Sequence, residues 1–109
     1  GARLGGRLIA EDLAALGIDV DCVPVADVPV AGADRVIGDR AFGDTPEQVA
    51  TLAGAQAEGL MAAGVLPVLK HLPGHGRATA DSHLDLPVVD TDRATLEATD
   101  FAAFRPLSR

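Results

Sequence analysis

Val65-Leu66-Pro67-Val68-Leu69-Lys70-His71-Leu72-Pro73-Gly74-His75-Gly76 is the stretch around which the rest of the chain is organised. Its first five residues form a short apolar run, which predicts a strand. Lys70 and His71 mark the polar end of this strand. Pro73 and Gly74 disfavour a helix and permit a sharp turn. The stretch therefore predicts a strand that leads directly into a polar loop.

The loop 70–83 contains all three histidines of the sequence and its only lysine. Asp81 precedes His83 by two residues, so in a turning loop its carboxylate can hold the imidazole and stabilise the charged ring. A histidine held in this way can donate and accept a proton near neutral pH. Two alternatives stay open: a solvated histidine beside an acidic residue, and a metal site formed by His71, His75, His83 and Asp81.

Three other chemistries fit the sequence less well. The glycines of the loop lack the Gly-x-x-x-x-Gly-Lys-Ser/Thr spacing of a phosphate-binding loop. Ser82 lacks the Gly-x-Ser-x-Gly surroundings of a serine nucleophile. Cys22 lies in an apolar segment, which predicts a packed and inert thiol. A single cysteine also excludes an internal disulfide.

Three helices and a second strand are predicted around this stretch. The first helix covers residues 3–16, with a buried stripe of Leu4, Leu8, Ile9, Leu13 and Leu16 and with Gly17 as its cap. The second begins at Thr45 and Pro46, with Gln48 completing a capping box, and ends at Gly64. The third covers roughly 92–105, capped by Asp90 or Thr91 and stopped by Pro106. Residues 22–26 predict a strand buried on both faces.

The joints from helix to strand are short, whereas both loops from strand to helix are long. This asymmetry is typical of α/β barrels and doubly wound sheets, whose functional residues lie at the carboxyl ends of parallel strands. Those ends carry Asp27 and the pair Lys70 and His71. Asp27 can equally be a residue that only caps a loop. Two strands cannot close a barrel, so we expect either a piece of a larger domain or a chain that assembles with others.

The composition excludes several classes of partner. A net charge of −7 argues against a nucleic-acid partner, because phosphate binding needs a basic face. The sequence has no cluster of lysine and arginine residues that would bind a membrane surface. It also has no apolar run that approaches the roughly 20 residues needed to span a bilayer. The hydrophobic fraction of 48% predicts a folded domain.

The motifs of the loop resemble those of a known family. Residues 70–76 (Lys-His-Leu-Pro-Gly-His-Gly), followed by Thr79-Ala80-Asp81-Ser82-His83, resemble the signature of family-three glycoside hydrolases, in their bacterial β-N-acetylglucosaminidase branch. Val23-Pro24-Val25-Ala26-Asp27-Val28 resembles a strand end of that family. Residues 37–42 resemble its Ile-Gly-x-Arg-x-Phe/Tyr loop, and residues 100–105 resemble the helix after the catalytic loop.

This resemblance implies that residues 1–109 are a fragment of a single family-three N-terminal domain. The fold class would be α/β, a partial TIM-type (β/α) barrel that supplies a central portion with two parallel strands and flanking helices. A whole barrel takes about 250 residues, so the remainder of the barrel, or self-association, would be needed. The branch implies a cytoplasmic bacterial location, and the chain shows no signal peptide.

The resemblance also assigns roles by position. His83 matches the histidine that acts as general acid and base, and Asp81 matches its partner carboxylate. Arg40, Lys70 and His71 match residues that hold the sugar. His75 would position the loop. The reaction implied is retaining removal of terminal β-linked N-acetylglucosamine from peptidoglycan fragments, without a metal or other cofactor, and phosphate could replace water as the acceptor.

The family's nucleophilic aspartate lies in an Asp-Asp-Leu-like segment, and this sequence has no such segment. Its Asp-Gln-Glu-Gly-Gly-Arg-like sugar-binding segment is also missing. We therefore expect the 109-residue chain alone to be inactive. The alternatives are a half-barrel remnant without turnover that binds sugar or oligomerises, and a metal-binding module.

Overall fold

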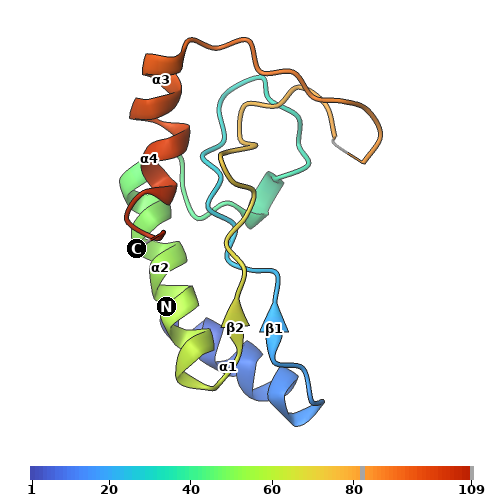
Figure 1. Cartoon of the computed structure of the whole chain (residues 1–109), viewed down its shortest axis with the longest axis vertical. Coiled ribbons are helices and arrows are strands. Elements are labelled where there is room, and N and C mark those ends of the chain that lie inside the picture. The colour runs from blue at the N-terminus through green and yellow to red at the C-terminus, as the bar shows by residue number, and fades with distance from the viewer. Residues whose placement is uncertain (82, 109) are drawn as a thin grey trace.

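The structure is a computed structural model, and it describes residues 1–81 and 83–108. Ser82, which was considered above as a nucleophile, lies outside the described residues. The elements, in chain order, are α1 (Ala2–Ala15), β1 (Val20–Asp21), the 3-10 helix η1 (Gly38–Arg40), α2 (Pro46–Ala62), β2 (Leu66–Pro67), α3 (Arg93–Ala98) and α4 (Asp100–Phe104). Helices α2, α3 and α4 run along one side, and both strands point toward the loops at one end of the molecule (Figure 1).

The two strands are parallel, as the sequence predicts, with Val20 opposite Leu66 and Asp21 opposite Pro67. They are shorter than predicted, because Pro24 has no N–H to donate to the ladder. Pairing resumes beyond it at a bridge between Val25 and Lys70. The carbonyl of Pro24 accepts from the Lys70 N–H at 3.1 Å. This bridge places the two polar strand ends side by side.

Cys22 is exposed, so the prediction of a packed thiol in a doubly buried strand is wrong. Among the described residues, β1 pairs only with β2, and nothing covers the outer part of this small sheet. Val20 is 45% exposed and Leu66 is 60% exposed. The buried part of the segment begins only at Pro24 and continues to Val28.

The ends of the two long helices agree with the predictions. The Thr45 side chain caps α2 by accepting from the Gln48 N–H at 3.3 Å, and Pro46 is its first residue. Gly17 and Gly64 follow α1 and α2 with φ angles of 78° and 84°. A positive φ is readily adopted only by glycine, so both glycines end their helices and turn the chain into a strand.

The predicted buried stripe of α1 is wrong except at Leu13, which is partly buried against the cluster of Ala10, Leu60 and Val65. Gly6 and Ala10 are its buried residues. The larger apolar side chains are partly or mostly exposed, with exposed fractions of 60% for Leu4, 55% for Leu8, 39% for Ile9 and 76% for Leu16. The reason is that α1 packs against α2 through small residues, so the backbones come close together and the large side chains point away.

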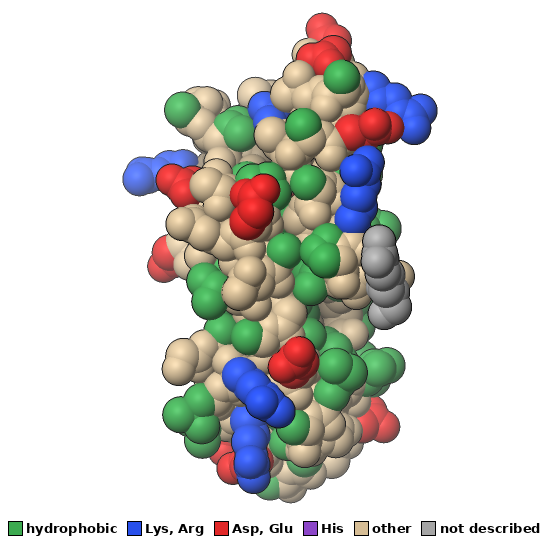
Figure 2. Space-filling view, turned by 90° about the vertical axis from the view of Figure 1, so that its left-hand side faces the viewer, with side chains coloured by type: hydrophobic (Ala, Val, Ile, Leu, Met, Phe, Trp, Pro, Cys, Tyr) green, Lys and Arg blue, Asp and Glu red, His purple; other side chains and the backbone are tan. Residues whose placement is uncertain are grey.

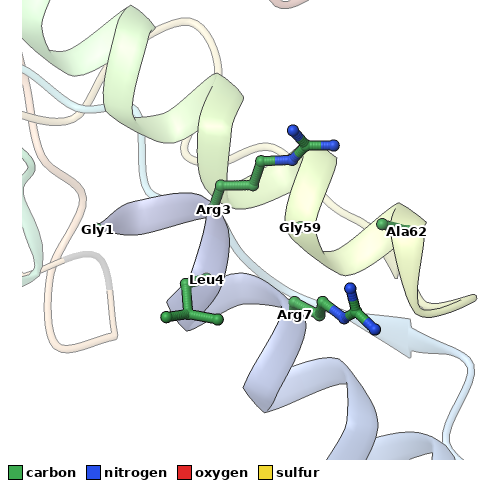
Figure 3. Close-up of a pocket in the computed structure, with 6 residues that line it drawn as sticks. All are labelled: Gly1, Arg3, Leu4, Arg7, Gly59 and Ala62. Carbon is green, nitrogen blue, oxygen red and sulfur yellow. The ribbon is translucent and has the colours of Figure 1, made fainter.

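Gly59 lies where α2 crosses α1, with Arg3 and Arg7 of α1 beside it (Figure 3). A Cβ atom on Gly59 would lie 2.1 Å from the carbonyl oxygen of Arg3. We expect Gly59→Ala to destabilise the fold by about 1–3 kcal/mol, because rigid backbone must move apart to admit the methyl group. Urea unfolding monitored by circular dichroism measures this loss.

Gly5→Ala is the matched control, since Gly5 is an exposed helical glycine with open space around its Cβ position. Alanine favours a helix over glycine by about 0.8–1 kcal/mol, so this variant should be slightly more stable than the parent chain. Equal effects of the two substitutions would contradict the close packing of α1 on α2.

The third helical region differs from the prediction at both ends. Asp92, rather than Asp90 or Thr91, caps α3 by accepting from the Thr95 N–H at 2.9 Å. The predicted single helix is divided at Thr99, which separates α3 from α4. The next residue, Asp100, is buried and binds a side chain from the loop, so a tertiary contact overrides the continuous helical pattern.

The core of the described residues consists of two clusters, and α2 contributes to both. One contains Ala26, Val28, Val49, Ala53, Ala103 and Phe104, and the other contains Ala10, Leu60 and Val65. Hydrophobic side chains also reach the surface at several places on the helical side of the molecule (Figure 2). Within the described residues, no helix is long and apolar enough to cross a membrane.

Candidate functional site

A pocket of about 240 Å³ lies where the two strand ends meet the loops, and we name it the strand-end pocket. Its lining consists of Val36, Ile37, Arg40, Lys70, His71, His75 and His83. Four of the five predicted site residues are thus brought to one place. Arg40 comes from η1, Lys70 and His71 from the end of the second strand segment, and His83 from the loop that follows.

The fifth predicted residue, Asp81, contacts His83. Its Oδ1 atom lies 2.7 Å from the ring Nδ1 of His83 and accepts from the backbone N–H of His83 at 2.9 Å. An ionised carboxylate only accepts hydrogen bonds, so the ring donates through Nδ1–H. Nε2 is then the ring nitrogen that has no hydrogen-bond partner among the described residues. The His83 side chain is 82% exposed, so this nitrogen can reach a ligand in solution.

Hydrogen bonds lower the pKa of Asp81 below 3.8, first from the backbone N–H of His83 and then from its side chain. A carboxyl group whose pKa is depressed by folding stabilises the folded state above its unfolded pKa. That contribution is lost as the pH falls through the lowered pKa. The Asp81 carboxylate is therefore ionised throughout the neutral range and available to hold His83.

Arg40 is fixed by backbone carbonyls at the entrance of the pocket. Its Nε donates to the Ile37 carbonyl at 3.3 Å, and Nη2 donates to the Val36 carbonyl. Lys70 is half-buried, and its backbone pairs with the neighbouring strand end. Both side chains are donors without acceptor capacity. Together they present positive groups to oxygen atoms of a ligand.

Asp27, which the sequence indicated only as a residue at a strand end, also belongs to this site. Asp27 is fully buried. Its Oδ2 lies 2.6 Å from Nδ1 of His71, and its Oδ1 accepts from the backbone N–H of His75 at 2.6 Å and of His71 at 3.4 Å. The sequence did contain a signal for this role. Asp27 ends a strand that was predicted to run parallel to the strand ending in Lys70 and His71.

His75 lines the pocket beside His71, with ring centroids 6.0 Å apart. Its Nε2 is buried and has no hydrogen-bond partner among the described residues. Within the described part of the chain, no three His, Cys, Asp or Glu side chains are arranged to hold a metal ion. The metal-binding alternative therefore has no ligand set in this geometry.

A larger pocket, of about 500 Å³, lies between α1 and α2 (Figure 3). Its lining consists of Gly1, Arg3, Leu4, Arg7, Gly59 and Ala62. This described lining contains no histidine or carboxylate that could transfer a proton. The strand-end pocket, whose lining includes three histidines, is the candidate site.

Comparison with known proteins identifies similar chains. The model of the N-terminal domain of glycosyl hydrolase family 3 matches residues 2–107. The beta-hexosaminidase of Methylococcus capsulatus is 45% identical over 108 residues, which are 99% of this chain and 32% of that protein. Beta-hexosaminidase LpqI of Mycobacterium tuberculosis is 62% identical over 68 residues, which are 62% of this chain and 18% of that protein.

Solved structures agree with these relatives. The crystal structure of NagZ from Neisseria gonorrhoeae in complex with N-trifluoroacetyl-D-glucosamine matches with a TM-score of 0.92 and 45% identity. The match covers 99% of this chain and 32% of that one. The chain thus spans a third or less of the length of each of these three relatives.

Proposed function

Because the chain belongs to glycosyl hydrolase family 3, we propose that it is a portion of a retaining β-N-acetylglucosaminidase and supplies that enzyme's acid–base pair and part of its sugar site. The strand-end pocket carries this proposal. It combines two cationic donors, Arg40 and Lys70, with a histidine whose Nδ1 is held by a carboxylate. Those are the groups needed to bind a polyhydroxylated ligand and to move a proton on it.

We also propose that the fold is one portion of a (β/α) barrel, and that the active site needs the remainder. Its two strands are parallel and their outer faces are exposed, which suits a sheet that continues on both sides. Self-association of the chain is the alternative way to cover these faces. The location proposed from the sequence resemblance, the bacterial cytoplasm, stays a prediction.

In the proposed mechanism, binding of the sugar and proton transfer are carried out by different residues. Arg40, Lys70 and His71 bind the terminal sugar and orient it. An aspartate from outside this chain attacks the anomeric carbon and forms the glycosyl-enzyme intermediate. His83 protonates the departing oxygen through Nε2 and then removes a proton from the acceptor that releases the sugar. Asp81 fixes the ring through Nδ1 and stabilises the imidazolium.

The proposed substrate is terminal β-linked N-acetylglucosamine of peptidoglycan fragments. The chemistry of the pocket supports a ligand rich in hydroxyl groups, because its charged lining residues are donors that bind oxygen. The bound N-trifluoroacetyl-D-glucosamine in the NagZ relative supports an N-acylated sugar. The peptidoglycan origin rests on the motifs of the sequence.

A chimera tests this function. In it, residues 1–108 of this chain replace the matching segment of the Methylococcus capsulatus beta-hexosaminidase. We expect the chimera to release the aryl group from an aryl N-acetyl-β-D-glucosaminide, whereas the 109-residue chain alone releases none, because the nucleophile is absent from it. Product release is followed by absorbance under identical conditions.

The two parts of the result address different claims. Turnover by the isolated chain, if His83→Ala abolished it, would show that the chain is complete and refute the proposed division of the site. A folded chimera without activity would favour the non-catalytic half-barrel. Aryl β-glucoside serves as the matched substrate control, since it lacks the N-acetyl group.

A further inference from the structure

The described part of the chain contains two histidine–carboxylate pairs of the same form. In each pair the ring Nδ1 contacts an aspartate, at 2.7 Å for His83 with Asp81 and 2.6 Å for His71 with Asp27. The first pair is exposed, whereas the carboxylate of the second is 0% exposed. The proposed mechanism uses the first pair and gives no role to Asp27.

Asp27 is surrounded by donors. Two backbone N–H groups, from His71 and His75, point at Oδ1, and the ring Nδ1 of His71 lies against Oδ2. A carboxylate that accepts two backbone N–H groups is held in one orientation, so its second oxygen faces the ring in a fixed direction. As an ionised carboxylate only accepts, the ring must carry its proton on Nδ1.

We propose that Asp27 is a positioning residue that fixes neutral His71 as its Nδ1–H tautomer and so makes Nε2 an acceptor for a hydroxyl group of the ligand. This deepens the proposed function and takes the class of ligand from it. Arg40 and Lys70, the cationic residues of the lining, can only donate to the ligand. An acceptor beside them matches a sugar hydroxyl, which donates one hydrogen bond and accepts others.

The tautomer is measured on the 109-residue chain with ¹⁵N-labelled histidine. Long-range ¹H–¹⁵N correlation spectra at about pH 8, where an ordinary imidazole is neutral, distinguish the two tautomers of each ring. The chain has three histidines, and His71→Gln and His75→Gln assign their signals. We expect His71 to be protonated on Nδ1 and unprotonated on Nε2.

Asp27→Asn tests the cause. The amide keeps the shape of the carboxylate, and the two backbone N–H groups select its oxygen for the Oδ1 position. Its NH2 group then faces the ring, so His71 should shift toward the Nε2–H tautomer. Asp81→Asn is the matched control: it should alter the His83 signals and leave those of His71 unchanged. The proposal is overturned by a wild-type His71 that carries a proton on Nε2, or by a His71 tautomer that Asp27→Asn leaves unchanged.

If Asp27→Asn does not fold, the wild-type tautomer alone decides. The ligand is tested separately by adding N-acetylglucosamine to the chimera described above, which contains the remainder of the barrel. We expect it to shift the Nε2 signal of His71, and we expect Asp27→Asn to weaken its binding roughly threefold to tenfold, as for the loss of one hydrogen bond. An Nδ1–H tautomer without any response to the sugar would uphold the role of Asp27 and count against the proposed function.

Discussion

His83→Ala in the chimeric hydrolase is expected to lower turnover of an N-acetyl-β-D-glucosaminide with an alkyl leaving group by about 10²–10⁴-fold, the contribution of a general acid and base. The loss is large because an alkoxide leaves very poorly unless it is protonated. Initial rates over a range of substrate concentrations separate turnover from binding. KM should change much less than turnover, since His83 acts on the leaving oxygen.

The leaving group provides the sharper readout. A nitrophenolate departs without protonation. On the nitrophenyl substrate, the same variant should therefore lose far less of the rate at which the glycosyl-enzyme intermediate forms. If His83 had a purely structural role, the variant would lower the rates on both substrates equally. Leu84→Ala is the matched control, since Leu84 is the next residue and is 87% exposed. It should leave both rates unchanged, and a comparable loss there would refute the assignment.

The sequence predicted those features that depend on local chemistry. Thr45 and Pro46 begin α2, and Gly17 and Gly64 end α1 and α2, because capping and positive φ are properties of a few neighbouring residues. The strand that leads into Lys70 and His71 was predicted for the same reason. Within the loop, the spacing of Asp81 and His83 was enough to predict their contact.

Features that depend on distant contacts were not predictable. The apolar pattern of α1 indicated the wrong face, because the pattern does not show that Gly6 and Gly59 let two backbones approach closely. The predicted third helix was continuous, because the pattern does not show that Asp100 meets Arg77 of the loop. Asp27 is the clearest case in the site: its two partners are 44 and 48 residues away.

Asp100→Ala is expected to reduce the free energy of unfolding by about 3–5 kcal/mol, as for the removal of one partner from a buried ion pair. Asp100 Oδ2 accepts from Nε of Arg77 at 2.6 Å, and these side chains are only 2% and 18% exposed. The variant leaves the Arg77 charge buried and without its carboxylate. Urea unfolding of the chain and of the variant measures the difference.

An exposed ion pair supplies the control. Arg93 and Glu97 form a similar contact at 2.8 Å, but the Arg93 side chain is 87% exposed. Screening by water and the loss of side-chain freedom reduce the contribution of such a pair to the free energy of unfolding to about 0.3–0.5 kcal/mol. Arg93→Ala should therefore change stability little. An equal loss in both variants would show that burial of Asp100 is not the cause.

The double variant Arg77→Met with Asp100→Leu separates the charge from the packing. If the loss in Asp100→Ala comes from an unpaired buried charge, replacing both partners by apolar side chains should restore most of the stability. If the double variant is as unstable as Asp100→Ala, the ion pair itself, or the fit of Asp100 against Gly74, determines stability. In either case Asp100 matters for the site, because it contacts the loop on both sides of His75, which lines the strand-end pocket. Gly74 precedes His75 in this loop and Arg77 follows it. A restored double variant would therefore keep this part of the loop in place without any charge at its base.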